Sequence, residues 1–350
     1  MSRISDIDKN FKVKIVSDRE DAVYLDANNP VFEINGIFYE DGKYRRMPKA
    51  VANGVSWGVS WLSGHTAGGR LRFKTDSQFV ILKATLGDIG KMPHFALTGS
   101  AGFDLYEKTD DKQKYVASFV PAFDIGETIS GIINFEDSKM REITINFPLY
   151  SEVLEVYIGL QETAEILPPT PYKYKKPIVF YGSSITQGGC ASRAGTSYEG
   201  FISRRLDTDY INLGFSGNAK GEDAIAEYIK NLDMSIFVYD YDHNAPDTEH
   251  LKNTHEKMFE TIREANPTLP IVIMSRPKFV LTDDEERRLE IIRQTYNNAI
   301  KSGDENVYFL TGRELMALCE NEGTVDNCHP TDLGFASIAA ALGDLLKKLL

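Results

Sequence analysis

The 350-residue sequence predicts two domains, an all-β domain over residues 1–172 and an α/β domain over residues 173–350. Three observations predict this division. Apolar and polar residues alternate through much of the first half, and short continuous apolar runs separated by helical patterns fill the second half. Between them stands LPPTPYKYKKP, residues 167–177, whose four prolines are typical of a semi-rigid linker.

The first half shows the period of two that marks half-buried strands. In GRLRFKT (69–75), Leu71 and Phe73 interleave with charged residues, and EITINFPLY (142–150) alternates in the same way. The segment EVLEVYIGL places four apolar residues on one expected face: Leu154, Val156, Ile158 and Leu160. Strong helical patterns are scarce before residue 165, so we expect an all-β sandwich or jelly roll.

The second half changes period. Five short apolar runs are expected to be buried strands: 178–182, 210–214, 235–240, 270–275 and 307–312. Helical spacing appears between them, for example over 248–266 and 282–300. Strands that alternate with helices predict a parallel sheet covered by helices on both faces. Ligands of such sheets bind outside the carboxyl ends of the strands.

Composition excludes several function classes. The net charge is −12 and no dense basic cluster occurs, so we expect no nucleic-acid surface. No run of eighteen apolar residues predicts a membrane span, and the first residues lack the apolar core of a signal peptide. Three cysteines do not suggest a disulfide framework. Together these features predict a cytoplasmic protein.

Polar clusters follow the predicted strands where the strand-end rule places a site. Ser184 comes directly after the first strand, and Asp326 and His329 follow the fifth. A serine hydroxyl becomes a useful nucleophile only when an adjacent base takes its proton, and an imidazole titrates near neutrality. Asp326 lies three residues before His329, within reach of the same ring if the segment turns. We therefore expect Ser184, His329 and Asp326 to form an acyl-transfer centre.

Neutral donors for an oxyanion follow the first three strands. They are the backbone N–H of Ser184, the backbone N–H of Gly217 and the side-chain amide of Asn244. The G-x-S-x-G elbow of α/β-hydrolases is not met, because Thr186 stands where its last glycine belongs. The aspartate also precedes the histidine directly. The arrangement thus differs from that fold.

These blocks resemble the SGNH, or GDSL-type, hydrolase superfamily. Residues 182–186, 212–217, 242–244 and 326–329 match the nucleophile, glycine, asparagine and D-x-x-H blocks in order, and GFDLY (102–106) resembles the β-rich GxDLY domain that precedes one bacterial branch. The resemblance implies a flavodoxin-like three-layer α/β/α fold with a five-stranded parallel sheet. It implies Ser184 as nucleophile, with Ser184, Gly217 and Asn244 as oxyanion donors. Ser183 departs from the family aspartate.

Several residues have two interpretations. Ser184 taken alone would be a helix cap. Trp57 and Trp61 suit sugar stacking, but tryptophans of this kind are more often core residues. Candidate substrate contacts are Trp61, His65, Arg193 and Asp242. The DYDHNAPD segment begins like a calcium loop but lacks its glycine and closing glutamate, so we expect no metal and no cofactor.

The sequence favours a serine esterase that removes acyl groups, with acetyl esters of carbohydrates as the first choice. Two alternatives remain open: an acyltransferase that uses the same centre, and a non-catalytic carbohydrate-binding protein. The expected partner is a small-molecule or oligosaccharide ester, with no nucleic acid and no membrane. A homo-oligomer is compatible with the sequence.

Overall fold

In the computed structural model, which describes residues 19–109 and 112–350, the alternating segments of the first half form two antiparallel sheets. One has the strand order β1 (Ala22–Asp26), β11 (Ser151–Gln161), β6 (Phe79–Ile89) and β9 (Thr128–Asn134). The other runs β12 (Ile166–Leu167), β5 (Arg70–Thr75), β10 (Arg141–Asn146), β7 (Phe103–Thr109) and β8 (Lys112–Phe119), with β2 (Glu33–Asn35) also paired to β5. A hairpin of β3 (Phe38–Glu40) and β4 (Lys43–Arg45) contacts β11.

The two antiparallel sheets enclose one core. Leu71 and Phe73 of β5 and Ile143 of β10 are fully buried, as their alternation predicts. They join Leu82 of β6 and Ile158 of β11 in a single apolar cluster, so the sheets pack face to face. The predicted all-β sandwich is confirmed, and a jelly-roll connection of its strands stays a prediction.

A β-bulge changes one predicted face. The pairing of β11 with β6 shifts register around Val153, and Val153 is fully buried while Leu154 is only partly buried. A bulge adds a residue to one strand and reverses the side-chain alternation at that point. Leu154 was expected beside Val156 on the core face, and that expectation was wrong for this reason.

The outer face of β5 is covered by the second half of the chain. The guanidinium of Arg70 contacts Asp209 and lies 3.7 Å from the centre of the Tyr210 ring. Arg72 donates to the Thr170 carbonyl at 2.6 Å within the proline-rich segment. The predicted linker is also shorter than expected, because β12 and β13 include its two ends. Of its remaining residues, Thr170 and Tyr172 contact Arg72 of β5.

The five predicted apolar runs form the parallel sheet, in the order β14 (Thr208–Gly214), β13 (Tyr174–Gly182), β15 (Ile236–Asp240), β16 (Ile271–Met274) and β17 (Val307–Leu310). Gly182 pairs in register with Gly214 on one side and with Asp240 on the other. The carboxyl ends of β13, β14 and β15 therefore lie side by side, which is where the sequence places the polar clusters.

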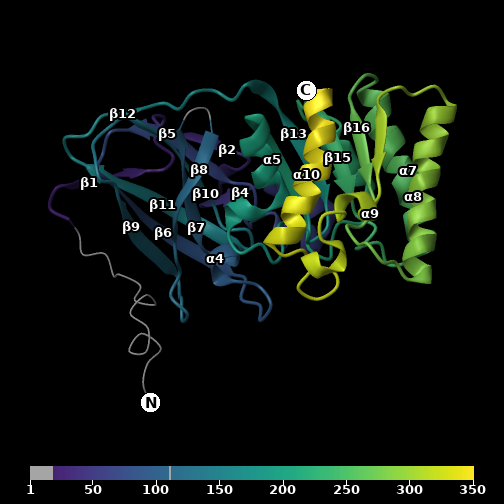
Figure 1. Ribbon diagram of the computed structural model, residues 1–350, viewed down its shortest axis with the longest axis horizontal. Helices are drawn as coiled ribbons and strands as arrows, with labels where there is room; N and C mark the ends of the chain where they lie inside the picture. Colours follow the sequence, from purple (N-terminus) through teal and green to yellow (C-terminus); the bar gives the residue numbers. More distant parts are fainter. Residues whose placement is uncertain (1–18, 110–111) are drawn as a thin grey trace, which may run out of the picture.

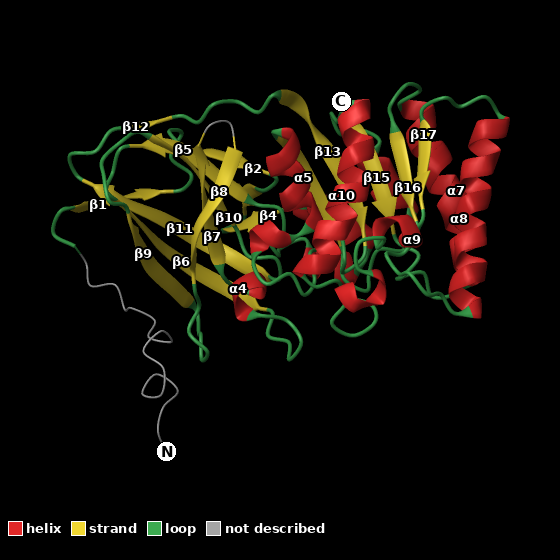
Figure 2. Cartoon of the chain, viewed as in Figure 1, coloured by secondary structure: helices red, strands yellow, loops and turns green. Residues whose placement is uncertain are grey.

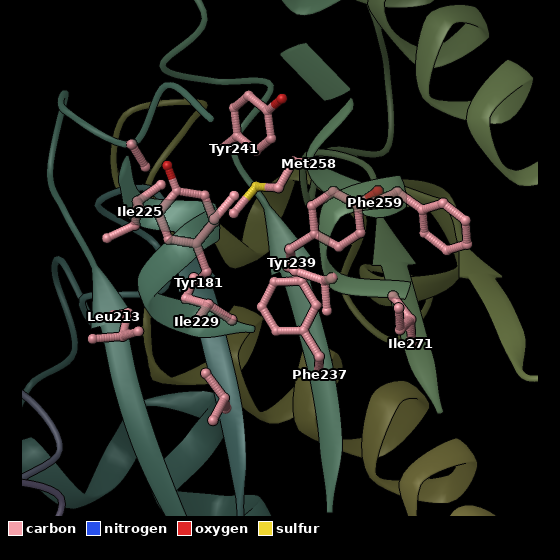
Figure 3. Packing of buried hydrophobic residues seen from close by; sticks show 14 of the residues in the cluster. Tyr181, Leu213, Ile225, Ile229, Phe237, Tyr239, Tyr241, Met258, Phe259 and Ile271 are labelled. Carbon is pink, nitrogen blue, oxygen red and sulfur yellow. The ribbon is translucent and has the colours of Figure 1, made fainter. Parts of the chain in front are cut away.

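Helices cover both faces of this sheet (Figure 2). The face in Figure 3 packs Tyr181, Phe237 and Tyr239 against α6 (Asp223–Ile229) and α7 (Thr248–Ala265), with α8 (Asp283–Lys301) beyond. The opposite face packs against α5 (Tyr198–Leu206), α9 (Gly312–Leu315) and α10 (Asp332–Leu349). The three-layer α/β/α prediction is confirmed. Within the described residues, no helix has the length and apolar content that crossing a membrane requires.

The two halves of the chain lie side by side (Figure 1), and Arg46 is one of the arginines that join them. Arg46 follows β4, and its buried guanidinium donates to the carbonyls of Gly214 at 2.6 Å and Asn212 at 3.1 Å. It also donates to the carbonyls of Leu62 at 2.7 Å and His65 at 2.8 Å. Burial lowers the pKa of Arg46 to about 9. This side chain links β14 to the loop that follows the short helix α3 (Trp57–Leu62).

Candidate active site

The nucleophile segment is a tight turn at the end of β13. A Cβ on Gly182 would lie 2.2 Å from Thr186 Oγ1 and 2.3 Å from the Asp240 carbonyl oxygen, so only glycine fits there. Ser183 is fully buried, its N–H donates to the Asp240 carbonyl at 3.1 Å, and its Oγ accepts from the Ile185 N–H at 3.2 Å. The serine that replaces the family aspartate thus stabilises the turn.

The structure brings the three expected catalytic side chains into one chain of hydrogen bonds. Ser184 Oγ lies 2.9 Å from His329 Nε2, although 145 positions separate them. His329 Nδ1 lies 2.8 Å from Asp326 Oδ2. With the proton on Nδ1, the ring donates to Asp326 and Nε2 is free to accept the Ser184 proton. The expected spatial arrangement is therefore present.

Asp326 holds both the histidine ring and its loop. Its Oδ1 accepts from the backbone N–H of His329 at 2.7 Å and of Cys328 at 3.1 Å. Burial raises the pKa of Asp326, but the backbone and ring hydrogen bonds from His329 outweigh it and bring the pKa below its usual value. The carboxylate is charged at neutral pH and stabilises an imidazolium at His329.

The three expected oxyanion donors follow the adjacent carboxyl ends of β13, β14 and β15. Among the described residues, neither the Ser184 nor the Gly217 backbone N–H has a hydrogen-bond partner. Gly217 has a φ of 69°, a left-handed conformation that favours glycine. A Cβ there would meet no protein atom within 4 Å, so the backbone conformation, and not close packing, explains the glycine at this position. Asn244 Oδ1 accepts from the Ala219 N–H at 3.4 Å, which leaves its Nδ2 for a ligand.

Two tryptophans lie beside this end of the sheet. Trp57 and Trp61 stack with ring centres 5.7 Å apart, and they are 80% and 42% exposed. Trp61 Nε1 donates to Asp88 Oδ2 at 2.8 Å, which fixes the ring. Between them, Gly58 packs so tightly on Asn218 that a Cβ would overlap its amide. The pair therefore borders the Gly217 loop and is not part of a core.

His65 lies beneath Trp61 and is almost fully buried. Burial lowers its pKa, with a partly compensating contribution from Asp88, so the ring is neutral at pH 7. Gln187 of the nucleophile turn contacts His65 Nδ1 at 3.3 Å. His65 was expected to touch substrate. In the structure it supports Trp61 from below, because no free face of the ring remains exposed.

Two other candidate substrate contacts are already occupied. The Arg193 guanidinium lies 3.3 Å from Asp104 Oδ2, contacts the Tyr106 hydroxyl and stacks on Tyr115, so it fastens the nucleophile segment to the β-sandwich. Asp242 is buried and lies 3.5 Å from Arg276. Both groups are therefore already paired with oppositely charged side chains, and a substrate contact by either stays a prediction.

The β-sandwich places two further side chains next to the catalytic residues that sequence reasoning did not predict, Tyr150 and His94. Tyr150 donates from its hydroxyl to the Ser184 carbonyl at 3.1 Å. The His94 ring lies 5.7 Å from the His329 ring, centre to centre. Cys190, near the end of the nucleophile segment, is half-buried, and burial raises its pKa to about 12, so it is a thiol. No local pattern around His94 or Tyr150 indicates a site, because only packing brings them there.

Comparison with protein families matches residues 175–347 to the GDSL-like lipase/acylhydrolase family and residues 22–166 to the N-terminal domain of SGNH-hydrolase-type esterases, named GxDLY. The chain belongs to the GDSL/SGNH hydrolase family. This family membership makes it a serine ester hydrolase. The predicted boundary at residues 172 and 173 lies between the two matched segments and stays a prediction.

Solved structures share the fold of this GDSL/SGNH hydrolase over nearly its whole length. One, assigned as a GDSL-like lipase from Bacteroides ovatus, is 27% identical with a TM-score of 0.84, covering 94% of this chain and 98% of the other. A salicylyl-acyltransferase from a tetracycline biosynthetic pathway is 18% identical (TM-score 0.77; 95% and 98% covered). An acetyl xylan esterase from the rumen bacterium Butyrivibrio proteoclasticus is 14% identical (0.57; 93% and 98%). A search of curated proteins gave no match.

Proposed function

We propose that this hydrolase removes acetyl groups from carbohydrates through an acyl-enzyme on Ser184. The observation that carries the proposal is the hydrogen-bonded series from Ser184 through His329 to Asp326, at 2.9 and 2.8 Å. Within the part of the chain that the structure describes, the backbone N–H groups of Ser184 and Gly217 have no hydrogen-bond partner, which supports their role as donors to an oxyanion. The carbohydrate part rests on the exposed tryptophan pair.

In the first half of the reaction, Ser184 Oγ attacks the ester carbonyl carbon while His329 Nε2 takes the hydroxyl proton. The carbonyl oxygen becomes an oxyanion, which the N–H groups of Ser184 and Gly217 and the Asn244 amide receive. The carbon–oxygen bond to the alcohol then breaks, and the imidazolium gives its proton to the leaving alcohol. Positioned general-base catalysis of this kind contributes about 10²–10⁴ in rate.

In the second half, water enters the site and His329 Nε2 takes one of its protons. The resulting hydroxide attacks the acyl carbon, and the bond to Ser184 Oγ breaks. The imidazolium returns a proton to Ser184, and the carboxylic acid leaves. Asp326 stays ionised throughout and stabilises the charged ring in both halves.

The tryptophan pair suits a sugar substrate. Trp57 and Trp61 present an exposed aromatic surface next to the Gly217 loop, and aromatic faces stack well on the apolar faces of sugar rings. Because Asp88 fixes the Trp61 ring, little side-chain entropy is lost on binding. The acetyl xylan esterase named above has the same fold, which agrees with this choice of substrate.

The central test compares wild type with Ser184→Ala on p-nitrophenyl acetate and on acetylated oligosaccharides, with release of acetate followed by mass spectrometry. We expect loss of at least about 10³-fold in kcat. A fluorophosphonate probe should label wild type and leave Ser184→Ala unlabelled. Turnover that survives in Ser184→Ala would refute the assignment, and so would wild-type protein that is folded but unlabelled.

The substrate class has its own test. Trp61→Ala should raise KM for acetylated oligosaccharides and leave p-nitrophenyl acetate kinetics unchanged, since only the sugar needs the aromatic face. Tyr39→Ala is a matched control, because it removes an exposed aromatic side chain from the β3–β4 hairpin. An equal effect on both substrates would argue against carbohydrate binding. Addition of alcohol acceptors to the same reactions would reveal acyl transfer as new esters.

We retain a cytoplasmic location as part of the proposal, supported by the three free cysteines, Cys190, Cys319 and Cys328. Fractionation of cells that produce the full chain tests this location.

A further inference from the structure

Three potential metal ligands meet next to the catalytic histidine. His94 belongs to the loop between β6 and α4 (Leu97–Ser100), Cys190 ends the nucleophile segment, and His329 is the proposed base. One ligand atom from each lies within 4.8 Å of the other two. The three residues come from two halves of the chain, so only the packing of the β-sandwich on the α/β domain creates this group.

Two of these ligands are uncommitted. Within residues 19–109 and 112–350, neither ring nitrogen of His94 nor the Cys190 sulfur has a hydrogen-bond partner. His94 is exposed, so its ring can rotate at little cost, whereas Cys190 and His329 are half-buried. A ligand that binds this group therefore has to compete only with the hydrogen bonds of His329.

The donor set favours a particular cation. Imidazole nitrogen and thiolate sulfur are both typical zinc ligands, and zinc sites with three protein ligands keep an open fourth position for water. With metal–ligand distances of about 2.0–2.3 Å, tetrahedral ligands lie roughly 3.5 Å apart. The three ligand atoms lie within 4.8 Å of one another, so side-chain movements on the order of 1 Å would bring them to that spacing, and His94 is exposed and free to move.

The surroundings also favour a cation. The Asp326 carboxylate, 2.8 Å from His329 Nδ1, adds negative charge and orients the ring, as outer-shell carboxylates do in zinc sites. A second group, formed by Asp240, Asp242 and His243, is less suitable. There, Asp242 is paired with Arg276, and the Arg288 guanidinium donates to the Asp242 carbonyl at 2.9 Å, so two positive charges oppose a metal ion.

We propose that His94, Cys190 and His329 form a zinc site that reversibly inhibits the hydrolase. On binding, the Cys190 thiol loses its proton to solvent and its sulfur bonds to the metal. His329 contributes one ring nitrogen. If this is Nε2, the bond to Ser184 is lost, and if it is Nδ1, the bond to Asp326 is lost. Either way the His329 ring can no longer take the Ser184 proton. Metal binding itself does not depend on the proposed esterase function; only the inhibitory effect does.

Binding is measured first on Ser184→Ala, which retains all three ligands and needs no activity. Titration with Zn²⁺ by calorimetry should show one equivalent bound, and Co²⁺ should give a thiolate-to-cobalt charge-transfer band. Cys190→Ser and His94→Ala, each in this background, should weaken Zn²⁺ binding by at least about tenfold, and Cys190→Ser should abolish the band. Cys319→Ser is the matched control and should bind as Ser184→Ala does.

Inhibition is then measured with p-nitrophenyl acetate on the otherwise wild-type chain. Zn²⁺ should abolish turnover and a chelator should restore it. Cys190→Ser and His94→Ala should retain activity without metal and need at least about tenfold more Zn²⁺ for half-inhibition. The proposal is overturned if Ser184→Ala binds no Zn²⁺, or if binding depends on Cys319 or Cys328 and not on Cys190. Failure of the esterase assignment would leave the calorimetry intact, so the two outcomes are distinguishable.

Discussion

Asp326→Asn tests how the carboxylate supports His329. Asparagine has nearly the same shape, and its oxygen can still accept from the backbone N–H groups of Cys328 and His329. Its amide then faces His329 Nδ1 with a donor. Nδ1 must accept, the proton moves to Nε2, and Nε2 can no longer take the Ser184 proton. The substitution should therefore affect catalysis and spare the fold.

The magnitude follows from the distance and the exposure. Unit charges about 4 Å apart attract by about 4 kcal/mol at an effective dielectric constant near 20. The Asp326 side chain is 38% exposed, so water screens the pair and we halve this value to about 2 kcal/mol, or roughly thirtyfold in rate. The wrong tautomer costs part of the general-base contribution in addition, so kcat should fall by about 10²–10³.

The assay is kcat for p-nitrophenyl acetate between pH 6 and 9, with thermal unfolding as the fold control. The melting temperature should stay near that of wild type, because the loop keeps its backbone hydrogen bonds. Asp326→Ala removes the carboxylate without imposing a tautomer, and it should retain more activity than Asp326→Asn if the loop is folded. A kcat within threefold of wild type for Asp326→Asn would refute the reasoning.

Three further predictions concern the oxyanion site, the contact between the two halves and a buried carboxyl group of α5. Asn244→Ala should lower kcat for p-nitrophenyl acetate by about 10²–10³ with little change in KM, and an unchanged kcat would remove Asn244 from the oxyanion site. Arg46→Met leaves several buried carbonyls unpaired and should lower the urea unfolding free energy by about 3 kcal/mol or more; a loss under 1 kcal/mol would contradict this. Burial raises the pKa of Glu199 from 4.5 to about 8, so the folded state binds an extra proton between these values and stability should fall as pH rises through that range. Glu199→Gln should flatten this dependence in urea unfolding at pH 5.5 and 8.5, and an identical slope in both proteins would show that another group is responsible.

Local sequence patterns predicted much of the fold. The helical spacing over 248–266 predicted α7, and the buried residues of that helix recur at helical intervals: Leu251, His255, Met258, Phe259 and Ile262. The five apolar runs became the parallel sheet because a strand that is covered on both faces needs apolar residues at successive positions. Where a local irregularity intervened, as at the bulge beside Val153, alternation alone gave the wrong face.

The site was only partly accessible to sequence reasoning. Ser184, Asn244 and His329 follow strands, so the strand-end rule brought them to one edge. Arg193 and Asp242 looked equally available, but each has an oppositely charged partner, Asp104 and Arg276, that is distant in sequence. The sequence around a polar loop residue does not reveal whether its side chain is free or already paired with a charge that is distant along the chain.

The sequence by itself determined the two structural classes, the order of the catalytic blocks and the glycine at the tight turn, because each depends on residues close together along the chain. The tertiary structure alone decided that the outer face of β5 is covered, that Trp61 borders the Gly217 loop, and that His94 lies beside His329. Periodicity indicates which face of a helix or strand is buried, but it does not identify the segment that packs against that face. The partner of each face is set by the packing of the β-sandwich on the parallel sheet, which no short segment encodes.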